Sequence, residues 1–88
     1  MKRQWWSEPV AIALGPDGTG VVSHTNQAID LLTQRWPPGH EEKGSYRAAC
    51  LACDRGLHDE LAEDRVRAAF VKAAEEAGVL VEIGRPDG

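Results

Sequence analysis

The chain has 88 residues, of which 42% are hydrophobic and 27% are charged, and its formal net charge is −4. This length supports one domain with one modest core, and this composition excludes a disordered or fibrous chain. The acidic charge argues against a general phosphate-binding surface, because nonspecific nucleic-acid binding depends on an excess of lysine and arginine. No apolar run approaches the roughly 20 residues that cross a bilayer, and the first residues do not form a signal-peptide core. We therefore expect a cytoplasmic protein without membrane contact.

The first predicted element is a β-hairpin. Apolar side chains alternate over residues 9–14, as in a half-buried strand. Residues 15–18, Gly-Pro-Asp-Gly, have turn chemistry, because proline presets one backbone dihedral and glycine permits a positive φ. The second strand follows at Val21 and Val22. The inward side of the first strand is expected to carry Val10, Ile12 and Leu14.

The next predicted element is a helix from Thr25, a good N-cap residue, to Trp36. At 100° per residue its apolar side chains gather on one side; they are Ala28, Ile29, Leu31, Leu32 and Trp36. Proline disfavours the α conformation in the residue before it, so Pro37 ends this helix. Trp36 lies in the centre of the apolar arc, and we predict that it is a core residue and not an exposed recognition residue. We interpret His24 as an exposed residue before the helix and not as a catalytic base.

Two further helices and a last strand complete the chain. The second helix is predicted from Ser45 to about Leu57, and its charges occupy so narrow a sector that we expect most of its surface to be covered. The third is predicted over residues 60–77, with Asp59 as its N-cap and Gly78 at the C′ position. The last strand covers residues 79–83.

The third helix has a predicted core arc and a charged outer face. The arc consists of Ala62, Val66, Ala69, Phe70, Ala73 and Ala77, and the outer face of Asp64, Arg65, Lys72 and Glu75. Glu63 and Arg67 are four residues apart in the favourable order and can pair on the boundary of the two faces. We interpret the charges as a solvated face.

Cys50 and Cys53 are the one pair that suggests a chemical site. Their CxxC spacing can serve half of a zinc site or a redox pair, with His40 or His58 as further ligands. Within a helix, however, both cysteines project into an apolar stripe, whereas His58 projects toward solvent. A redox pair also needs one thiol at a helix N-terminus, and Cys50 lies inside this helix. We therefore predict that the cysteines pack in the core, and that the protein holds no metal or other cofactor.

A set of mostly apolar motifs extends over nearly the whole chain. They are Pro9-Val10 after a tryptophan, Ala28 with Leu32 and Trp36-Pro37, Ala49 with Cys53, Arg67 to Phe70, and Ala73 to Gly78. With these motifs, from about Trp6 to Val81, the chain resembles an uncharacterised family of short proteins, a domain-of-unknown-function family found mainly in rhizobia and related alpha-proteobacteria. The resemblance implies one complete bacterial cytoplasmic domain. It implies no activity, cofactor or catalytic residue.

Together these elements predict an α+β fold with a single domain over residues 1–88 and an ordered core over about 6–83. An N-terminal β-hairpin, three helices and a C-terminal strand that joins the hairpin are expected to pack in two layers. The order of the strands in the sheet stays open.

No group of residues has the pattern of a catalytic site. The leading hypothesis is a small noncatalytic module that binds a protein or regulates one. The alternatives are a nucleic-acid-binding protein with a local basic and aromatic patch and, third, a small enzyme or metal-binding protein. Candidate contacts to a partner or an anion are Trp5, Trp6, Arg35, His40, Lys43 and Arg47.

Three of these candidates have a structural alternative. The stem of Arg35 can cover apolar surface while its guanidinium reaches the helix C-terminus, and the two N-terminal tryptophans can pack on their own domain. A three-stranded sheet also leaves two unpaired edges. With the apolar area of Trp5 and Trp6, these edges lead us to expect a homodimer.

Overall fold

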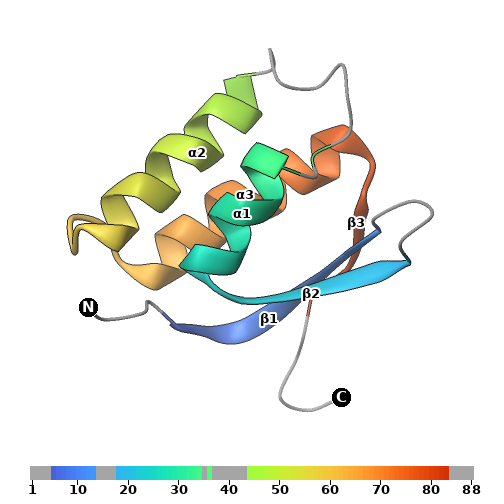
Figure 1. The fold of residues 1–88 in the computed structure, drawn as a ribbon, viewed down its shortest axis with the longest axis horizontal. Helices are drawn as coiled ribbons and strands as arrows, with labels where there is room; N and C mark the ends of the chain where they lie inside the picture. Colours follow the sequence, from blue (N-terminus) through green and yellow to red (C-terminus); the bar gives the residue numbers. More distant parts are fainter. Residues whose placement is uncertain (1–4, 14–17, 35, 37–43, 84–88) are drawn as a thin grey trace.

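The computed structural model describes residues 5–13, 18–34, 36 and 44–83. The elements in these residues are β1 (Trp5–Ala13), β2 (Thr19–His24), α1 (Thr25–Gln34), α2 (Gly44–Leu57), α3 (Glu63–Ala77) and β3 (Leu80–Ile83). The helices lie on one side of the sheet, which gives two layers (Figure 1). The predicted α+β fold, with an N-terminal hairpin, three helices and a C-terminal strand, is confirmed.

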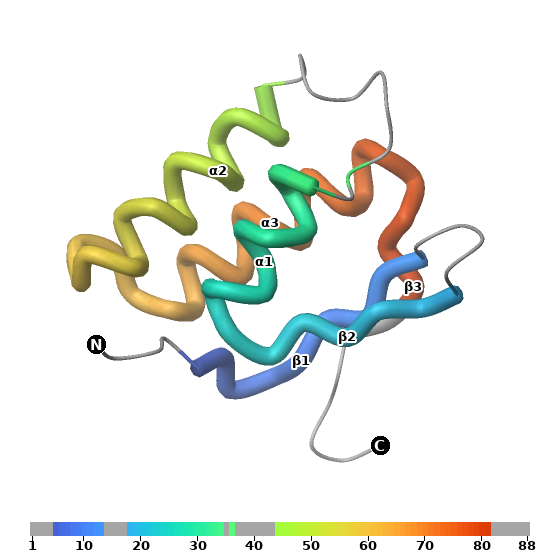
Figure 2. Tube along the Cα trace, viewed as in Figure 1, coloured from blue at the N-terminus to red at the C-terminus, as the bar shows by residue number. Residues whose placement is uncertain are grey.

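The described strands form one antiparallel sheet in the order β2-β1-β3. The C-terminal strand therefore joins the hairpin at β1, and β2 is an outer strand (Figure 2). In the register, Ala11 of β1 lies opposite Val21 of β2 and Glu82 of β3. The neighbouring pair, Val10 and Val22, is fully buried against the helices. The alternation predicted for the first strand is confirmed at Val10 and Ile12, whereas Leu14 lies outside the described residues.

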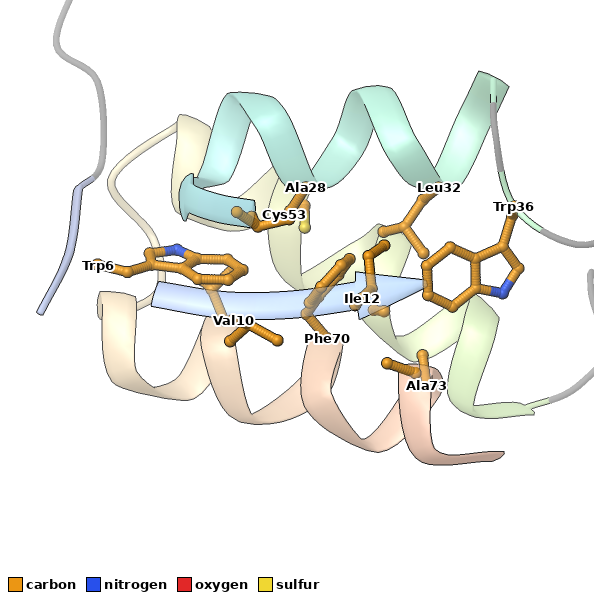
Figure 3. Close-up of a cluster of buried hydrophobic side chains, with 13 residues drawn as sticks. Trp6, Val10, Ile12, Ala28, Leu32, Trp36, Cys53, Phe70 and Ala73 are labelled. Atoms are coloured by element: carbon orange, nitrogen blue, oxygen red, sulfur yellow. The ribbon is translucent and has the colours of Figure 1, made fainter. Parts of the chain in front are cut away.

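The centre of the core is an aromatic row. Phe70 of α3 lies between Trp6 of β1 and Trp36, which follows α1, with ring centroids 5.5 Å and 5.7 Å apart (Figure 3). Trp36 is only 8% exposed, so its predicted core position is confirmed. The predicted helix to Trp36 is too long, because the described part of α1 ends at Gln34 and Trp36 itself lies in a bend. Aliphatic and small side chains from both layers fill the space around the row; they are Val10, Ile12, Val22, Ala28, Leu32, Ala49, Cys53, Val66, Ala73 and Ala74.

The predicted start of the third helix is wrong. Asp59 does not cap it, because α2 closes with a turn in which Asp59 has a φ of 60°. The amide of Glu60 returns to the Arg55 carbonyl at 2.8 Å, so it belongs to the end of α2. The third helix begins at Glu63, after Ala62, which leaves Ala62 exposed instead of in the core arc. Aspartate is among the few residues other than glycine that adopt such a left-handed conformation readily.

The second helix is also less covered than predicted. It packs against α3 and α1 through Ala49, Ala52, Cys53 and Gly56. Its opposite side is open to solvent, and Leu51 there is 53% exposed. Small residues such as Ala48 lie on this open side and are exposed. The exposed surface of α2 is therefore wider than the sector that carries its charged residues.

Glu63 and Arg67 do not form the ion pair that their spacing allows. Both side chains instead contact the N-terminal half of β1, where β3 provides no strand partner. Glu63 accepts hydrogen bonds from the amide and the hydroxyl of Ser7, at 3.3 Å and 3.1 Å. Arg67 Nε donates to the Glu8 carbonyl at 2.8 Å, and its NH2 group lies 3.0 Å from Glu8 Oε1. These contacts replace strand pairing, because they satisfy backbone groups at an otherwise open edge.

Candidate functional site

A groove of about 360 Å³ lies between β2 and α1. Its lining residues are Gly20 and Val21 of β2 and Gln27, Asp30, Leu31 and Gln34 of α1. Because α1 follows β2 without a linker, the chain turns at their junction (Figure 2), and one flank of the helix lines the groove beside the outer strand.

The backbone of β1 determines which way each residue of β2 faces. The amide of Ala13 donates to the Val79 carbonyl at 2.7 Å, on the β3 side of β1. The register of β1 with β3 shifts between Ala11 and Ile12, but its register with β2 is regular over the same residues, so the irregularity lies in β3 and β1 is regularly extended. Backbone groups alternate in direction along an extended strand, so Ala11 faces β3 as well and Ile12 faces β2. Val21 lies opposite Ala11. These two residues therefore do not exchange hydrogen bonds, and the N–H and C=O groups of Val21 point away from the sheet.

The hydrogen bond of Ser23 agrees with this direction. Its amide donates to Gln27 Oε1 at 2.7 Å and not to β1. Ser23 and Val21 are two residues apart in one strand, so their backbone groups face the same way. The Gln27 side chain thus occupies the edge at Ser23. The backbone amide of Gln27 donates to His24 Nδ1 at 3.3 Å. At Val21 no further hydrogen bond to a described residue uses the outward backbone groups, so the edge is open there.

The open edge lies beside both apolar and negative side chains. Val21 is 54% exposed, and Leu31 of the facing helix is half-buried. Asp30 is exposed, and no described residue forms an ion pair or hydrogen bond with its carboxylate. The groove therefore offers one backbone donor, one backbone acceptor, an apolar wall and an uncompensated negative charge. This arrangement can bind a polypeptide backbone, and it contains no nucleophile with a neighbouring base.

The two N-terminal tryptophans, both predicted as contact residues, have different environments. Trp6 is only 6% exposed, and its Nε1 donates to Thr25 Oγ1 at 3.1 Å, so it is a core residue and not a surface contact. Trp5 is 59% exposed, and its ring centroid lies 4.8 Å from that of His24 in an edge-on contact. His24, which we expected to be exposed, is half-buried.

Of the four predicted basic contacts, the structure describes only Arg47. Arg47 is exposed on the first turn of α2. Among the described residues, no hydrogen bond, ion pair or ring contact joins Arg47 to Trp5 or Trp6. The other three candidates, Arg35, His40 and Lys43, lie outside the described residues.

The cysteines lie as the helix projection predicted. Cys53 is fully buried in the core, and Cys50 is half-buried beside it. Burial, together with the nearby Cys50, raises the pKa of the Cys53 thiol to about 12, so this thiol stays protonated. His58 is exposed, and its Nδ1 lies 2.8 Å from the Asp54 carbonyl oxygen in the preceding turn. Within the described ranges, no three His, Cys, Asp or Glu side chains are placed to hold a metal ion.

The groove residues were not predicted from the sequence. The only available signal was that a three-stranded sheet has two open edges. Strand order decides which strand forms an edge, and the sequence left that order open. Val21 was recognised as a strand residue but not as an edge residue.

None of the helices in the described part combines the length and the apolar composition that a bilayer crossing requires. No curated protein and no solved structure matches the chain. The rhizobial origin that the sequence resemblance implies stays a prediction. The expected membership in a family of unknown function, by contrast, is confirmed. A family model described as "Protein of unknown function (DUF982)" matches residues 8–81, and the chain belongs to this family.

Proposed function

We propose that this protein is a small noncatalytic module that binds a protein partner, and thereby regulates it, through the groove between β2 and α1. The observation that carries the proposal is the open strand edge at Val21, where an N–H and a C=O group face outward beside an exposed apolar side chain. Unpaired strand edges pair readily with other chains, and soluble proteins normally protect them. The N-terminal half of β1 has such protection, because Glu63 and Arg67 contact its backbone at Ser7 and Glu8.

The distribution of charge favours a protein partner over nucleic acid. The exposed basic residues of α3, Arg65 and Lys72, stand among exposed carboxylates of the same helix; these are Asp64, Glu75 and Glu76. A phosphate backbone requires a surface on which positive charge predominates. Asp30 also makes the groove itself negative, which disfavours a phosphate there.

We also propose that the protein acts in the bacterial cytoplasm. Both cysteines are free, as is usual in a reducing bacterial cytoplasm. The homodimer expected from the open sheet edges is a separate proposal, because the negative charge of Asp30 makes a second copy a poor occupant of the groove. Light scattering tests it: a mass of twice 9.6 kDa at high micromolar concentration supports the dimer, and the monomer mass contradicts it.

Photo-crosslinking in the native host tests the groove directly. A photoreactive residue is introduced at Gln34, which is exposed in the groove, and as a matched control at Lys72, which is exposed on α3. We expect one discrete adduct from position 34, identified by mass spectrometry, and no such adduct from position 72. Equal adducts from both positions, or none from position 34, would contradict the proposed site.

A further inference from the structure

We infer that the groove binds an extended segment of another protein as an added strand on β2, with a basic side chain facing Asp30. This inference rests on the proposed function and adds the binding mode and the chemistry of the partner. Strand addition uses main-chain hydrogen bonds for affinity and alternate side chains for specificity. Val21 of the outer strand offers both outward main-chain groups and an exposed side chain.

The pairing geometry follows from the outward groups of Val21. The incoming residue opposite Val21 exchanges two hydrogen bonds with it, one to its N–H and one to its C=O. Its side chain then lies beside that of Val21, which is 54% exposed and favours an apolar neighbour. The residues before and after it point to the other side of the sheet, toward Asp30 and Leu31 of α1.

The hydrogen bond from Ser23 to Gln27 limits the length of the added strand. Because Gln27 already satisfies the Ser23 amide, pairing cannot continue past that position without displacing the Gln27 side chain. On the other side of Val21, Gly20 has no side chain to obstruct an approaching strand. The groove volume of about 360 Å³ accommodates a few side chains, which suits a short peptide segment more than a folded domain.

Charge selects the partner. No described residue compensates the Asp30 carboxylate, so a lysine or arginine at the facing position forms a favourable ion pair. A second copy of this chain is a poor occupant for the same reason. Antiparallel pairing of two β2 strands about Val21 brings both Asp30 side chains to the same side of the sheet, near the symmetry axis. Each copy also has a net charge of −4.

The test uses labelled synthetic peptides and the full chain. The host peptide alternates threonine and valine, and one position carries arginine, glutamine or glutamate. Two further peptides have the arginine sequence with N-methyl groups on alternate amides, one peptide for each of the two phases, so that each blocks strand pairing along one edge of the peptide. Fluorescence anisotropy measures Kd, and amide NMR of the chain locates the binding. The variants are Asp30→Asn, Val21→Pro and, as an exposed carboxylate control on α3, Asp64→Asn.

We expect the arginine peptide to bind about fivefold more tightly than the glutamine peptide and the glutamate peptide to bind weakest. Asp30→Asn removes this order, whereas Asp64→Asn keeps it. The N-methyl peptide whose methyl groups face β2 fails to bind, whereas the peptide of the other phase binds. When the arginine peptide binds, the Val21 amide becomes protected from hydrogen exchange. Val21→Pro abolishes binding while keeping a cooperative melt, because proline is tolerated where an edge amide faces outward.

Three results would overturn the inference. They are equal affinity for all three charges, binding by both N-methyl phases, and protection of amides elsewhere than in β2. If no peptide binds while Gln34 still crosslinks to a protein in the host, strand addition is wrong and the proposed function stands. If position 34 yields no adduct, the proposed function fails as well.

Discussion

The indole Nε1 of Trp6 donates a 3.1 Å hydrogen bond to Oγ1 of Thr25, and both residues are buried. Trp6 lies near the start of β1, and Thr25 is the first residue of α1. This bond therefore joins the central strand to the junction at which β2 continues into α1. That junction also positions the flank of α1 beside the open edge of β2, so we expect the bond to matter for the groove as well as for the core.

Replacing Thr25 tests this bond. Thr25→Val keeps the shape of the side chain but leaves the Trp6 N–H group buried without its acceptor, and we expect the free energy of unfolding to fall by about 1 to 3 kcal/mol. Urea denaturation measures the loss. Thr25→Ser is the control, because it retains the hydroxyl group, and it should lose less stability than Thr25→Val. A larger loss in Thr25→Ser than in Thr25→Val would show that the methyl group and not the hydroxyl group matters.

Trp36 provides the contrasting case. Its Nε1 is buried without a hydrogen-bond partner among the described residues, so only its ring packing stabilises the fold. Trp36→Ala should lose about 3 to 5 kcal/mol, and Trp36→Phe should retain most of that stability. Thermal melting of the two variants tests this. If Trp36→Ala melts within a few degrees of the parent while the Gln34 adduct disappears, Trp36 is a recognition residue and not a core residue.

The contact between Arg67 and Glu8 is expected to stabilise the unpaired half of β1. The Arg67 side chain is 17% exposed and holds both the carbonyl and the carboxylate of Glu8. Lysine cannot reproduce this forked geometry, so Arg67→Lys should lower the free energy of unfolding by about 1 kcal/mol. The exposed Arg65→Lys is the matched control and should change it by less than about 0.5 kcal/mol. Similar effects at both positions in urea denaturation would refute a special role for Arg67.

The raised pKa of Cys53 predicts a large difference in thiol reactivity. At about pH 8 a thiol with a pKa of about 12 is almost wholly protonated, and Cys53 is also fully buried. In the folded protein, the Cys50→Ser variant should therefore react with a thiol reagent at least about tenfold more slowly than Cys53→Ala, which retains the half-buried Cys50. Both variants should react fast in denaturant. Rapid reaction of Cys53 in the folded state would contradict the core position.

The pKa of His58 predicts a pH dependence of stability. The bond to the Asp54 carbonyl, and then the charge of Asp54, raise this pKa above its ordinary value of 6.5. Protonation of His58 therefore stabilises the folded state fully below the unfolded pKa, and this stability is lost as the pH rises through the folded pKa. His58→Gln should lower the melting temperature at about pH 5.5 and have little effect at about pH 8.5.

An NMR titration of His58 checks the cause of that shift. The Asp54→Asn variant removes the charge and keeps the carbonyl bond, so the pKa should fall only part of the way toward its ordinary value. A complete return would mean that the charge alone raises it. No change would mean that the carbonyl bond alone does.

Local periodicity determined a large part of this fold. Alternation over residues 9–14 predicted that Val10 and Ile12 are buried, because successive side chains of any strand point to opposite faces. The helical projection of α2 likewise placed Cys53 in the core. These predictions succeeded because they depend on backbone geometry within a few residues of the side chain concerned.

Only the tertiary structure decided which residues form the candidate site. The strand order β2-β1-β3 makes β2 an outer strand and opens the edge at Val21, and it depends on pairing between β1 and residues about 70 positions later in the chain. The partners of Glu63 and Arg67 were unpredictable for the same reason, because Ser7 and Glu8 lie more than 50 residues away in sequence. Hydrogen bonds between such distant segments depend on how the whole domain packs, and local sequence patterns do not determine that packing.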